Sequence, residues 1–324
     1  MNKRDSSIDN ISGLLIVYMI LYHIFQMSGF GDANHSYGML PLSFFMFWFF
    51  YKSGMLYKGK APKEILLGGG KKLLVPYILF SFIGHLLKCL KMFVEGETNW
   101  VHYVLTPIKQ ILVSGSLAGN LPLWFLPSLL AVQLMYAELH KKLHDAWIII
   151  ISLFIAYCLY RFNIDKPLYL GNVTLGLAVY CFGHLMRNFQ YHKYVFILAG
   201  MTYLANMLTM QGTIDFRSNM PHNCYYLVVV LSALSGCVVI NNIFKRTSIR
   251  LCLLEYVGKH SMNFYVMHWL VLLACSIVYP YTGWVRLGAM ITMCLVSLPV
   301  LNRIYLLLMM RSNANLKIKG EKHK

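Results

Sequence analysis

Charged residues are scarce in this chain. Of its 324 residues, 13% are charged and only 12 are acidic, whereas 58% are hydrophobic. A soluble domain carries charge on about a quarter of its residues, because polar side chains must cover its surface. A soluble globular protein and a disordered chain are therefore both excluded. The composition, with a mean hydropathy of +0.55, predicts a polytopic membrane protein whose fold is an all-α transmembrane helical bundle.

Paired cysteines and a signal-peptide cleavage site are also missing. The eight cysteines show no CxxC or other paired spacing, and most fall in apolar runs, so we expect free thiols and no metal cluster. Lys3 and Arg4 precede an apolar run that starts at Ile8, but no small-residue cleavage site follows before Gly29. We therefore expect this first apolar segment to be retained as a membrane span.

Apolar segments of about 20 residues, the length that crosses the roughly 30 Å of a bilayer's hydrocarbon core, recur along the chain. Ten candidate spans cover about residues 8–28, 39–57, 73–94, 121–139, 146–160, 168–186, 194–210, 222–242, 260–280 and 284–309, and the fifth and seventh are short. The sequence shows no internal repeat and no soluble domain. Residues 1–324 are therefore expected to form a single transmembrane domain.

Positive charge has a regular placement between these spans. The net charge of +17 would suggest nucleic acid as a partner in a soluble chain. With the N-terminus in the cytoplasm, most of the 29 Lys and Arg residues fall in cytoplasmic segments, as the positive-inside rule requires. The charge pattern therefore indicates topology, with both termini inside and no role for nucleic acid. Between spans three and four, residues 95–120 are long enough to form a re-entrant or interfacial helix that caps a cavity.

Four histidines, His23, His85, His184 and His268, fall within predicted spans. An ionisable residue inside a membrane is costly and suggests function, although a neutral histidine can equally serve as a hydrogen-bonded contact between helices. His85 and His184 lie near span ends, where a structural role is favoured. For His23 and His268 both interpretations stay open at this point.

His23 lies about 22 Å into the first span, fifteen residues after Ile8. Asp9 precedes it by fourteen residues, which is two heptads, so the two side chains share a helix face about 21 Å apart. A hydrogen bond between them is impossible at that separation. Any group that orients His23 must come from another helix.

Five short motifs occur in order along the chain. They are Asp9-Asn10-Ile11-Ser12-Gly13 with an apolar run to His23, the segment 49–56 with Ser53-Gly54, the segment 71–77 with Lys71-Lys72 before Pro76-Tyr77, the Trp-Phe-Leu run at 124–126, and the segment 258–268 with Gly258, Ser261, Tyr265 and His268. Together they resemble acyltransferase family 3, the membrane O-acyltransferases that modify bacterial surface sugars.

This resemblance implies a catalytic role for His23, as general base or as transient acyl carrier. It also implies that Lys71, Lys72 and the position of Ser12 bind an acyl-CoA donor. Many family members carry arginines at 71 and 72 and Arg or Lys at position 12, so the donor-binding cations here are weaker or differently placed. The positive-inside rule would place lysines at 71 and 72 in any case, and that alternative stays open.

Six further residues are candidates for lining or supporting a cavity: Asp9, Ser53, Trp124, Ser261, Tyr265 and His268. Ser261, Tyr265 and His268 recur at i, i+4 and i+7, which is one face of a helix. Such a polar stripe suits either a binding cavity or hydrogen bonds between helices. Trp124 alone is more typical of an interfacial anchor.

The chemistry of acyl transfer suits these residues. A sugar hydroxyl that attacks a thioester must lose its proton, and histidine, with an ordinary pKa near 6.5, is a natural base for that step. The sequence therefore predicts an enzyme of the cell envelope, an acetyl-CoA-dependent O-acetyltransferase in the simplest case. It would sit in the bacterial inner membrane, act in polysaccharide biosynthesis and use no metal. Its acceptor would be a polysaccharide or a lipid-linked precursor.

Two other classes of protein remain as alternatives. A transporter or flippase for a lipid-linked sugar also suits ten spans with buried histidines, but such proteins are typically built from repeats, and none is detectable here. A purely structural membrane subunit would leave the ordered set of motifs without an explanation.

Overall fold

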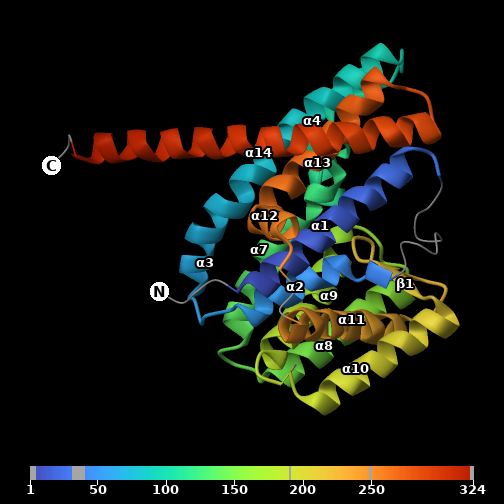
Figure 1. Ribbon diagram of the computed structural model, residues 1–324, viewed down its shortest axis with the longest axis vertical. Coiled ribbons are helices and arrows are strands. Elements are labelled where there is room, and N and C mark those ends of the chain that lie inside the picture. Colours follow the sequence, from blue (N-terminus) through green and yellow to red (C-terminus); the bar gives the residue numbers. More distant parts are fainter. Residues whose placement is uncertain (1–4, 31–40, 190, 248–249, 322–324) are drawn as a thin grey trace.

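The computed structural model describes residues 5–30, 41–189, 191–247 and 250–321, and side chains up to residue 307. Lys3 and Arg4 of the expected cytoplasmic tail, and the first two residues of the span predicted over 39–57, lie outside the described residues. The chain is overwhelmingly helical, as the composition predicts, and Figure 1 shows the arrangement.

The order of elements follows the predicted spans closely. The helices are α1 (Ser6–Met27), α2 (Phe45–Met55), α3 (Pro62–Gly69), α4 (Val75–Val94), α5 (Trp100–Leu105), α6 (Pro107–Ser114), α7 (Phe125–Leu139), α8 (Asp145–Arg161), α9 (Leu168–Met186), α10 (Lys193–Ala205), α11 (Tyr226–Thr247), α12 (Cys252–Lys259), α13 (Ser261–Val278) and α14 (Trp284–Glu321). The turns η3 (Gly70–Leu74) and η5 (Asn206–Met210) are π-helical, η4 (Ala118–Trp124) is 3-10 helical, and β1 (Thr213–Asp215) pairs antiparallel with β2 (Met220–His222).

Seven helical segments of the described chain are long and apolar enough to cross a membrane. They are Ser6–Met27, Pro62–Val94, Pro107–Leu139, Leu168–Met186, Tyr226–Thr247, Ser261–Val278 and Trp284–Leu307. The other three predicted spans correspond to α2, α8 and α10 with η5, which are helical but shorter. An all-α membrane bundle is thus confirmed, whereas the count of ten and the orientation of the termini stay predictions.

Helix α1 runs through the middle of the bundle, with α4, α13 and α14 on one side and α8, α10 and α11 on the other (Figure 1). It packs against α2, α11, α12, α13 and α14. At its first end Asp5 forms an ion pair of 2.9 Å with Lys245 at the end of α11. At its second end the carbonyl of Ser28 accepts the N–H of Gly283 at 2.9 Å. Contacts at both ends thus fix the position of α1.

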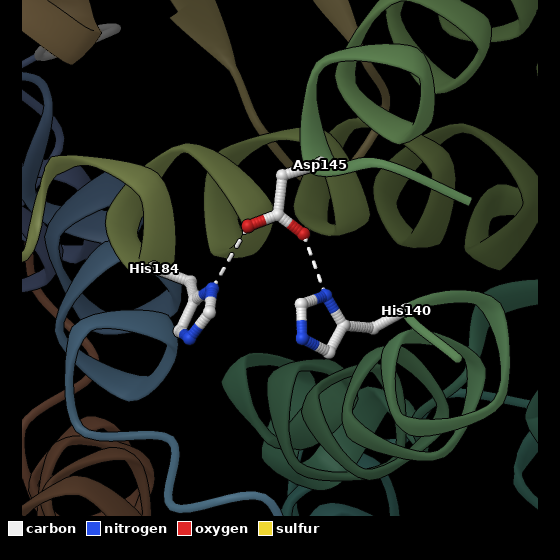
Figure 2. Close-up of side chains that lie close together, drawn as sticks. All are labelled: His140, Asp145 and His184. Carbon is white, nitrogen blue, oxygen red and sulfur yellow. Dashed lines mark hydrogen bonds and ion pairs between the residues drawn. The ribbon is translucent and has the colours of Figure 1, made fainter. Parts of the chain in front are cut away.

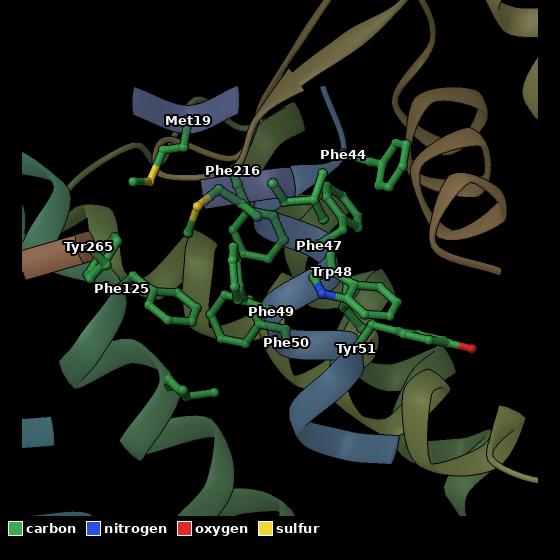
Figure 3. Packing of buried hydrophobic residues seen from close by; sticks show 14 of the residues in the cluster. Met19, Phe44, Phe47, Trp48, Phe49, Phe50, Tyr51, Phe125, Phe216 and Tyr265 are labelled. Carbon is green, nitrogen blue, oxygen red and sulfur yellow. The ribbon is translucent and has the colours of Figure 1, made fainter. Parts of the chain in front are cut away.

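Helix α2 forms the aromatic centre of the core. Its sequence is apolar on every side, which is the pattern of a helix surrounded by protein, and Trp48, Phe50 and Tyr51 have no exposed surface. The ring of Phe50 lies 5.0 Å from that of Phe125 in α7 and 4.9 Å from that of Phe216, the residue after β1 (Figure 3). The short hairpin is therefore anchored in the bundle by its own aromatic side chain.

Glycines set the closest helix contacts, and several belong to the sequence motifs. A Cβ on Gly13 would lie 2.0 Å from the carbonyl oxygen of Leu254, and one on Gly258 would lie 1.7 Å from that of Asp9. Gly54 brings α2 against α9 in the same way, with Tyr180 as its neighbour. Only a residue without a side chain lets two backbones approach so closely. These motif glycines are therefore packing positions.

The segment 95–120 forms the short helices α5 and α6 and the start of η4, in agreement with the helical connection predicted there. η4 packs between α4 and α13. A mutual contact of Gly84 and Gly119 brings α4 against η4, since a Cβ on Gly119 would lie 1.9 Å from the Gly84 carbonyl oxygen. This packing holds the end of η4 over the second half of α1.

Candidate active site

A cavity of about 380 Å³ lies beside the second half of α1. Its wall comes from α1, the start of α2, η4, the β1–β2 hairpin and α13. The lining includes Tyr22, His23, Gln26, Trp124, Asp215, Phe216, Arg217, His222, Tyr265 and Trp269. This volume lies in the range of small-molecule sites, which are largely apolar with a few placed polar groups.

His23 lies on the cavity wall beside a second histidine. Its ring stacks on that of His268 with 5.3 Å between centroids and 20° between planes, and it meets Trp269 edge-on at 5.1 Å. The Nδ1 atom of His23 is buried and has no hydrogen-bond partner among the described residues. Buried polar atoms are usually hydrogen-bonded. An unpartnered nitrogen beside a cavity is therefore a candidate for contact with a ligand.

The tautomer of His268 follows from one hydrogen bond. Its Nδ1 lies 2.6 Å from the backbone carbonyl of Tyr265, and because a carbonyl oxygen can only accept, Nδ1 must carry the hydrogen. Nε2 is then the acceptor nitrogen of the neutral ring. That atom is buried and has no hydrogen-bond partner in the described part of the chain. Two imidazoles thus meet at the cavity, one of them with a fixed tautomer.

The structure places Trp124 and Tyr265 of the predicted residues on the cavity wall. The indole of Trp124 stacks at 6.1 Å on the ring of Phe216 from the hairpin. The hydroxyl of Tyr265 donates to the carbonyl of Pro122, which ties α13 to η4. His268 lies directly behind His23 and has no exposed surface. The late helical motif and the Trp-Phe-Leu motif therefore converge on His23.

Asp9, Ser53 and Ser261 lie away from this wall. Asp9 is buried near the start of α1, Ser53 donates its hydroxyl to the carbonyl of Phe49 at 2.8 Å, and Ser261 is the first residue of α13. A serine that bonds the carbonyl four residues earlier serves its own helix. For these three residues the structure provides packing roles and no contact with the cavity.

Ser12 meets a cation that the sequence analysis did not assign to it. Its hydroxyl donates to the carbonyl of Ile8 at 2.7 Å and accepts a hydrogen bond from the Lys52 ammonium at 2.9 Å. The resemblance implies Arg or Lys at position 12 in many relatives. Here a lysine from α2 supplies positive charge at the same place. No sequence spacing shows this, because residues 12 and 52 meet only through the packing of α1 and α2.

Lys71 and Lys72 lie in the π-helical turn η3, and their side chains are exposed. A Cβ on the nearby Gly69 would approach Leu130 of α7 to 2.9 Å. Leu130 is six residues beyond Trp124, so this contact is displaced by about 9 Å along α7 from the cavity wall. The two lysines are therefore separate from the histidines and lie toward the end of the bundle where α7 finishes.

The hairpin supplies the polar residues that the sequence analysis missed. Asp215, which the sequence analysis did not single out, lines the cavity with Arg217 and His222. Its carboxylate accepts the N–H of Arg217 at 3.0 Å and the hydroxyl of Ser218 at 2.6 Å. The Nε of Arg217 is buried and has no hydrogen-bond partner among the described residues. Strands of three residues leave no detectable periodicity, so the sequence gives no signal of this wall.

The membrane-spanning helices and a family match together define a membrane acyltransferase. A family model described as an acyltransferase domain matches residues 5–302, and the chain belongs to acyltransferase family 3. The match spans α1 to α14 and includes every residue of the cavity wall. Comparison with curated proteins and with solved structures found no match.

Proposed function

We propose that this protein moves an acyl group, an acetyl group in the simplest case, from acyl-CoA to a sugar hydroxyl. The acceptor would belong to a cell-surface polysaccharide or its lipid-linked precursor, and the enzyme would work in a bacterial inner membrane. The observation that carries the proposal is the pairing of His23 with His268 at a cavity inside an acyltransferase bundle.

The lining of the cavity supports a sugar as acceptor. Aromatic side chains of Tyr22, Trp124 and Trp269 line the cavity and can pack against the apolar face of a sugar ring. Asp215 and Arg217 provide an acceptor and several donors of hydrogen bonds. A site that presents both kinds of surface suits a polyhydroxylated ligand better than a purely apolar one.

His23 would provide the proton transfer that the reaction needs. As the sugar oxygen attacks the thioester carbonyl, a C–O bond forms, the C–S bond breaks and the hydroxyl proton passes to a nitrogen of His23. The thiolate of CoA then takes that proton. In the covalent variant His23 receives the acyl group first and the hydroxyl attacks it afterwards. Both routes require a neutral imidazole whose nitrogen is free to face the cavity.

The donor would approach from the end of the bundle that carries Lys71 and Lys72. Their exposed ammonium groups can neutralise CoA phosphates, although as point charges without the fork geometry of arginine. Lys52 beside Ser12 adds a third cation. The thioester end of the pantetheine arm would then reach between the helices toward His23.

The experiment is acetyl-CoA turnover by purified protein in detergent, followed through free thiol, with a polysaccharide or membrane extract as acceptor. Acceptor-dependent thiol release is expected for the wild type. It should fall by about 10²–10⁴-fold in His23→Ala, which is the usual contribution of a general acid–base group.

His85→Ala is the matched control, because His85 is also a buried histidine within a span-length segment but stacks on Tyr103, away from the cavity lining. Retained turnover in His23→Ala would remove His23 from the reaction. A wild type that binds no donor at all would favour transport of a lipid-linked sugar.

A further inference from the structure

A second cluster of polar side chains lies where α7, α8 and α9 meet, outside the cavity. Its members are Tyr136 and His140 at the end of α7, Asp145 at the start of α8, and His184 near the end of α9. His140, Asp145 and His184 each offer an atom within 4.8 Å of the others. These residues come from three separate segments of the chain, so no sequence spacing groups them, and the expectation of no metal rested on the cysteines alone.

Both histidines address the same carboxylate. His140 Nδ1 lies 2.8 Å from Oδ1 of Asp145, and His184 Nδ1 lies 2.9 Å from Oδ2 (Figure 2). The hydroxyl of Tyr136 completes the group, at 2.7 Å from His184 Nδ1, 2.9 Å from Asp145 Oδ1 and 3.2 Å from His140 Nδ1. Four side chains from three helices thus point at one place.

These contacts outnumber the hydrogens available to make them. With Asp145 ionised, as an aspartate is at neutral pH, the cluster holds three hydrogens: one on each Nδ1 and one on the Tyr136 oxygen. Five close contacts between electronegative atoms therefore share three hydrogens. With the imidazole hydrogens on Nε2 instead, both Nδ1 lone pairs and the Asp145 oxygens can face a cation at the centre.

We propose that His140, Asp145 and His184 bind a divalent transition-metal ion, with zinc as the representative of the class and the Tyr136 oxygen next to the fourth position. Two imidazoles and a carboxylate are ligands that zinc and its neighbours in the first row accept readily. This proposal is independent of the proposed acyl transfer.

The cluster needs little movement to accept the ion. Ligands about 2.0–2.1 Å from a tetrahedral zinc lie about 3.3 Å from one another. The observed contacts of 2.8 and 2.9 Å with Asp145 must therefore open by a few tenths of an ångström, and the ligand atoms of the two histidines, which lie within 4.8 Å of each other, must come to the same separation. The side chain of His140 is 40% exposed and that of Asp145 only 9%. An ion can therefore enter past His140 and meet an anchored carboxylate.

The surroundings favour a site that stabilises this end of the bundle. The ring of Tyr57, just after α2, packs edge-on against Tyr136 at 5.1 Å and His184 at 5.7 Å and so covers the ligands. Tyr136 lies twelve residues beyond Trp124, about 18 Å along α7. At that distance from the cavity, the ion would join three helix ends and take no part in the chemistry at His23.

Metal content tests the proposal directly. The protein would be purified with a tag that contains no histidine, stripped with a chelator, dialysed against micromolar Zn²⁺ and analysed for bound metal. One zinc per chain is expected. A visible absorption spectrum typical of tetrahedral coordination is expected when Co²⁺ replaces zinc.

Two variants and one control decide whether these residues are the ligands. Asp145→Asn keeps the size of the side chain but loses its charge and replaces one acceptor oxygen with an NH2 donor, and His140→Ala combined with His184→Ala removes both imidazoles. Each should weaken zinc binding by more than about tenfold. His192→Ala, an exposed histidine outside the cluster, should bind zinc as the wild type does.

A thermal unfolding scan with and without Zn²⁺ provides the second measurement. Zinc should raise the apparent unfolding temperature of the wild type and of His192→Ala, because an ion that binds only the folded state stabilises it. It should leave that of Asp145→Asn unchanged. A folded wild type that binds no stoichiometric zinc, or an Asp145→Asn that binds it equally well, would overturn the proposal.

Discussion

Two neutral imidazoles in stacked contact have unequal roles. His23 faces the cavity, whereas His268 lies behind it with its Nδ1 hydrogen committed to the Tyr265 carbonyl. His268 therefore positions the His23 ring by stacking on the face of that ring that points away from the cavity.

His268→Ala should consequently reduce kcat while leaving both KM values close to those of the wild type. Removing a positioning group loosens the base without removing it, so we expect a loss of about tenfold, smaller than the 10²–10⁴-fold loss for His23→Ala. Steady-state kinetics with varied donor and varied acceptor separate the two effects. A rise in acceptor KM at constant kcat would instead make His268 a binding residue.

At the residue scale, the sequence predicts those site residues that lie on long regular helices and misses those that do not. His23, Tyr265 and His268 lie on long helices, where depth and face follow from counting. Trp124 was accessible through its motif. Asp215 and Arg217 were not, because a hairpin of three-residue strands has no period to detect. Lys52 was missed for another reason: its contact with Ser12 exists only after α1 and α2 pack.

The contact of helix α2 with α9 depends on glycine. A Cβ on Gly54 would lie 1.8 Å from the carbonyl oxygen of Tyr180, and Gly183 approaches Tyr51 in the same way. Backbone atoms cannot move aside as a flexible side chain can. Gly54→Ala must therefore separate the two helices and disturb the aromatic core around α2.

We expect Gly54→Ala to lower the apparent unfolding temperature in detergent by about 2–4 °C, as overpacking typically costs about 1–3 kcal/mol. Gly200→Ala is the matched control. Gly200 lies within α10 with nothing within 4 Å of an added Cβ, and alanine is the better helix former. Equal unfolding temperatures of the two variants would show that α2 and α9 pack less closely than they do in this structure.

The turn η3 presents Lys71 and Lys72 on an exposed π-helical segment. If they bind the phosphates of CoA, changing both to Gln should raise the donor KM several-fold and leave the acceptor KM unchanged. Lys141 and Lys142, exposed in the turn after α7, form the control pair because they share the expected side of the membrane. An equal effect on both KM values, or an equal effect of both pairs, would assign these lysines to topology alone.

At the element scale, prediction from apolar length located the long helices but not the short helices α3 and α12, and it was less exact about which helices span the membrane. α2 has only 11 helical residues and α8 has 17. Hydropathy measures how apolar a segment is, and a helix buried among other helices is as apolar as one that faces lipid. Hydropathy does not report the length of each helix in the folded structure, because that length depends on where caps and glycines end the helix.

For the whole molecule, the distribution of charge still predicts which face lies in the cytoplasm. Lys245 and Arg246 end α11, with Lys245 paired to Asp5 before α1, and Lys259 ends α12. The positive-inside rule predicts that this end lies inside. Cys252 at the start of α12 is exposed and belongs to the same end. Its thiol can therefore report the orientation of the entire bundle.

Changing Cys89, Cys158 and Cys224 to Ser leaves Cys252 as the exposed thiol beside four buried ones. We expect this variant to react with a membrane-impermeant maleimide only after cells are permeabilised. In the same background, Cys252→Ser combined with Glu97→Cys should give labelling in intact cells, since Glu97 is exposed in the connection after α4. The pair controls for thiol reactivity, because each variant has one exposed thiol. Labelling of Cys252 in intact cells would invert the topology and place Lys71 and Lys72 outside, where no cytoplasmic acyl-CoA could reach them.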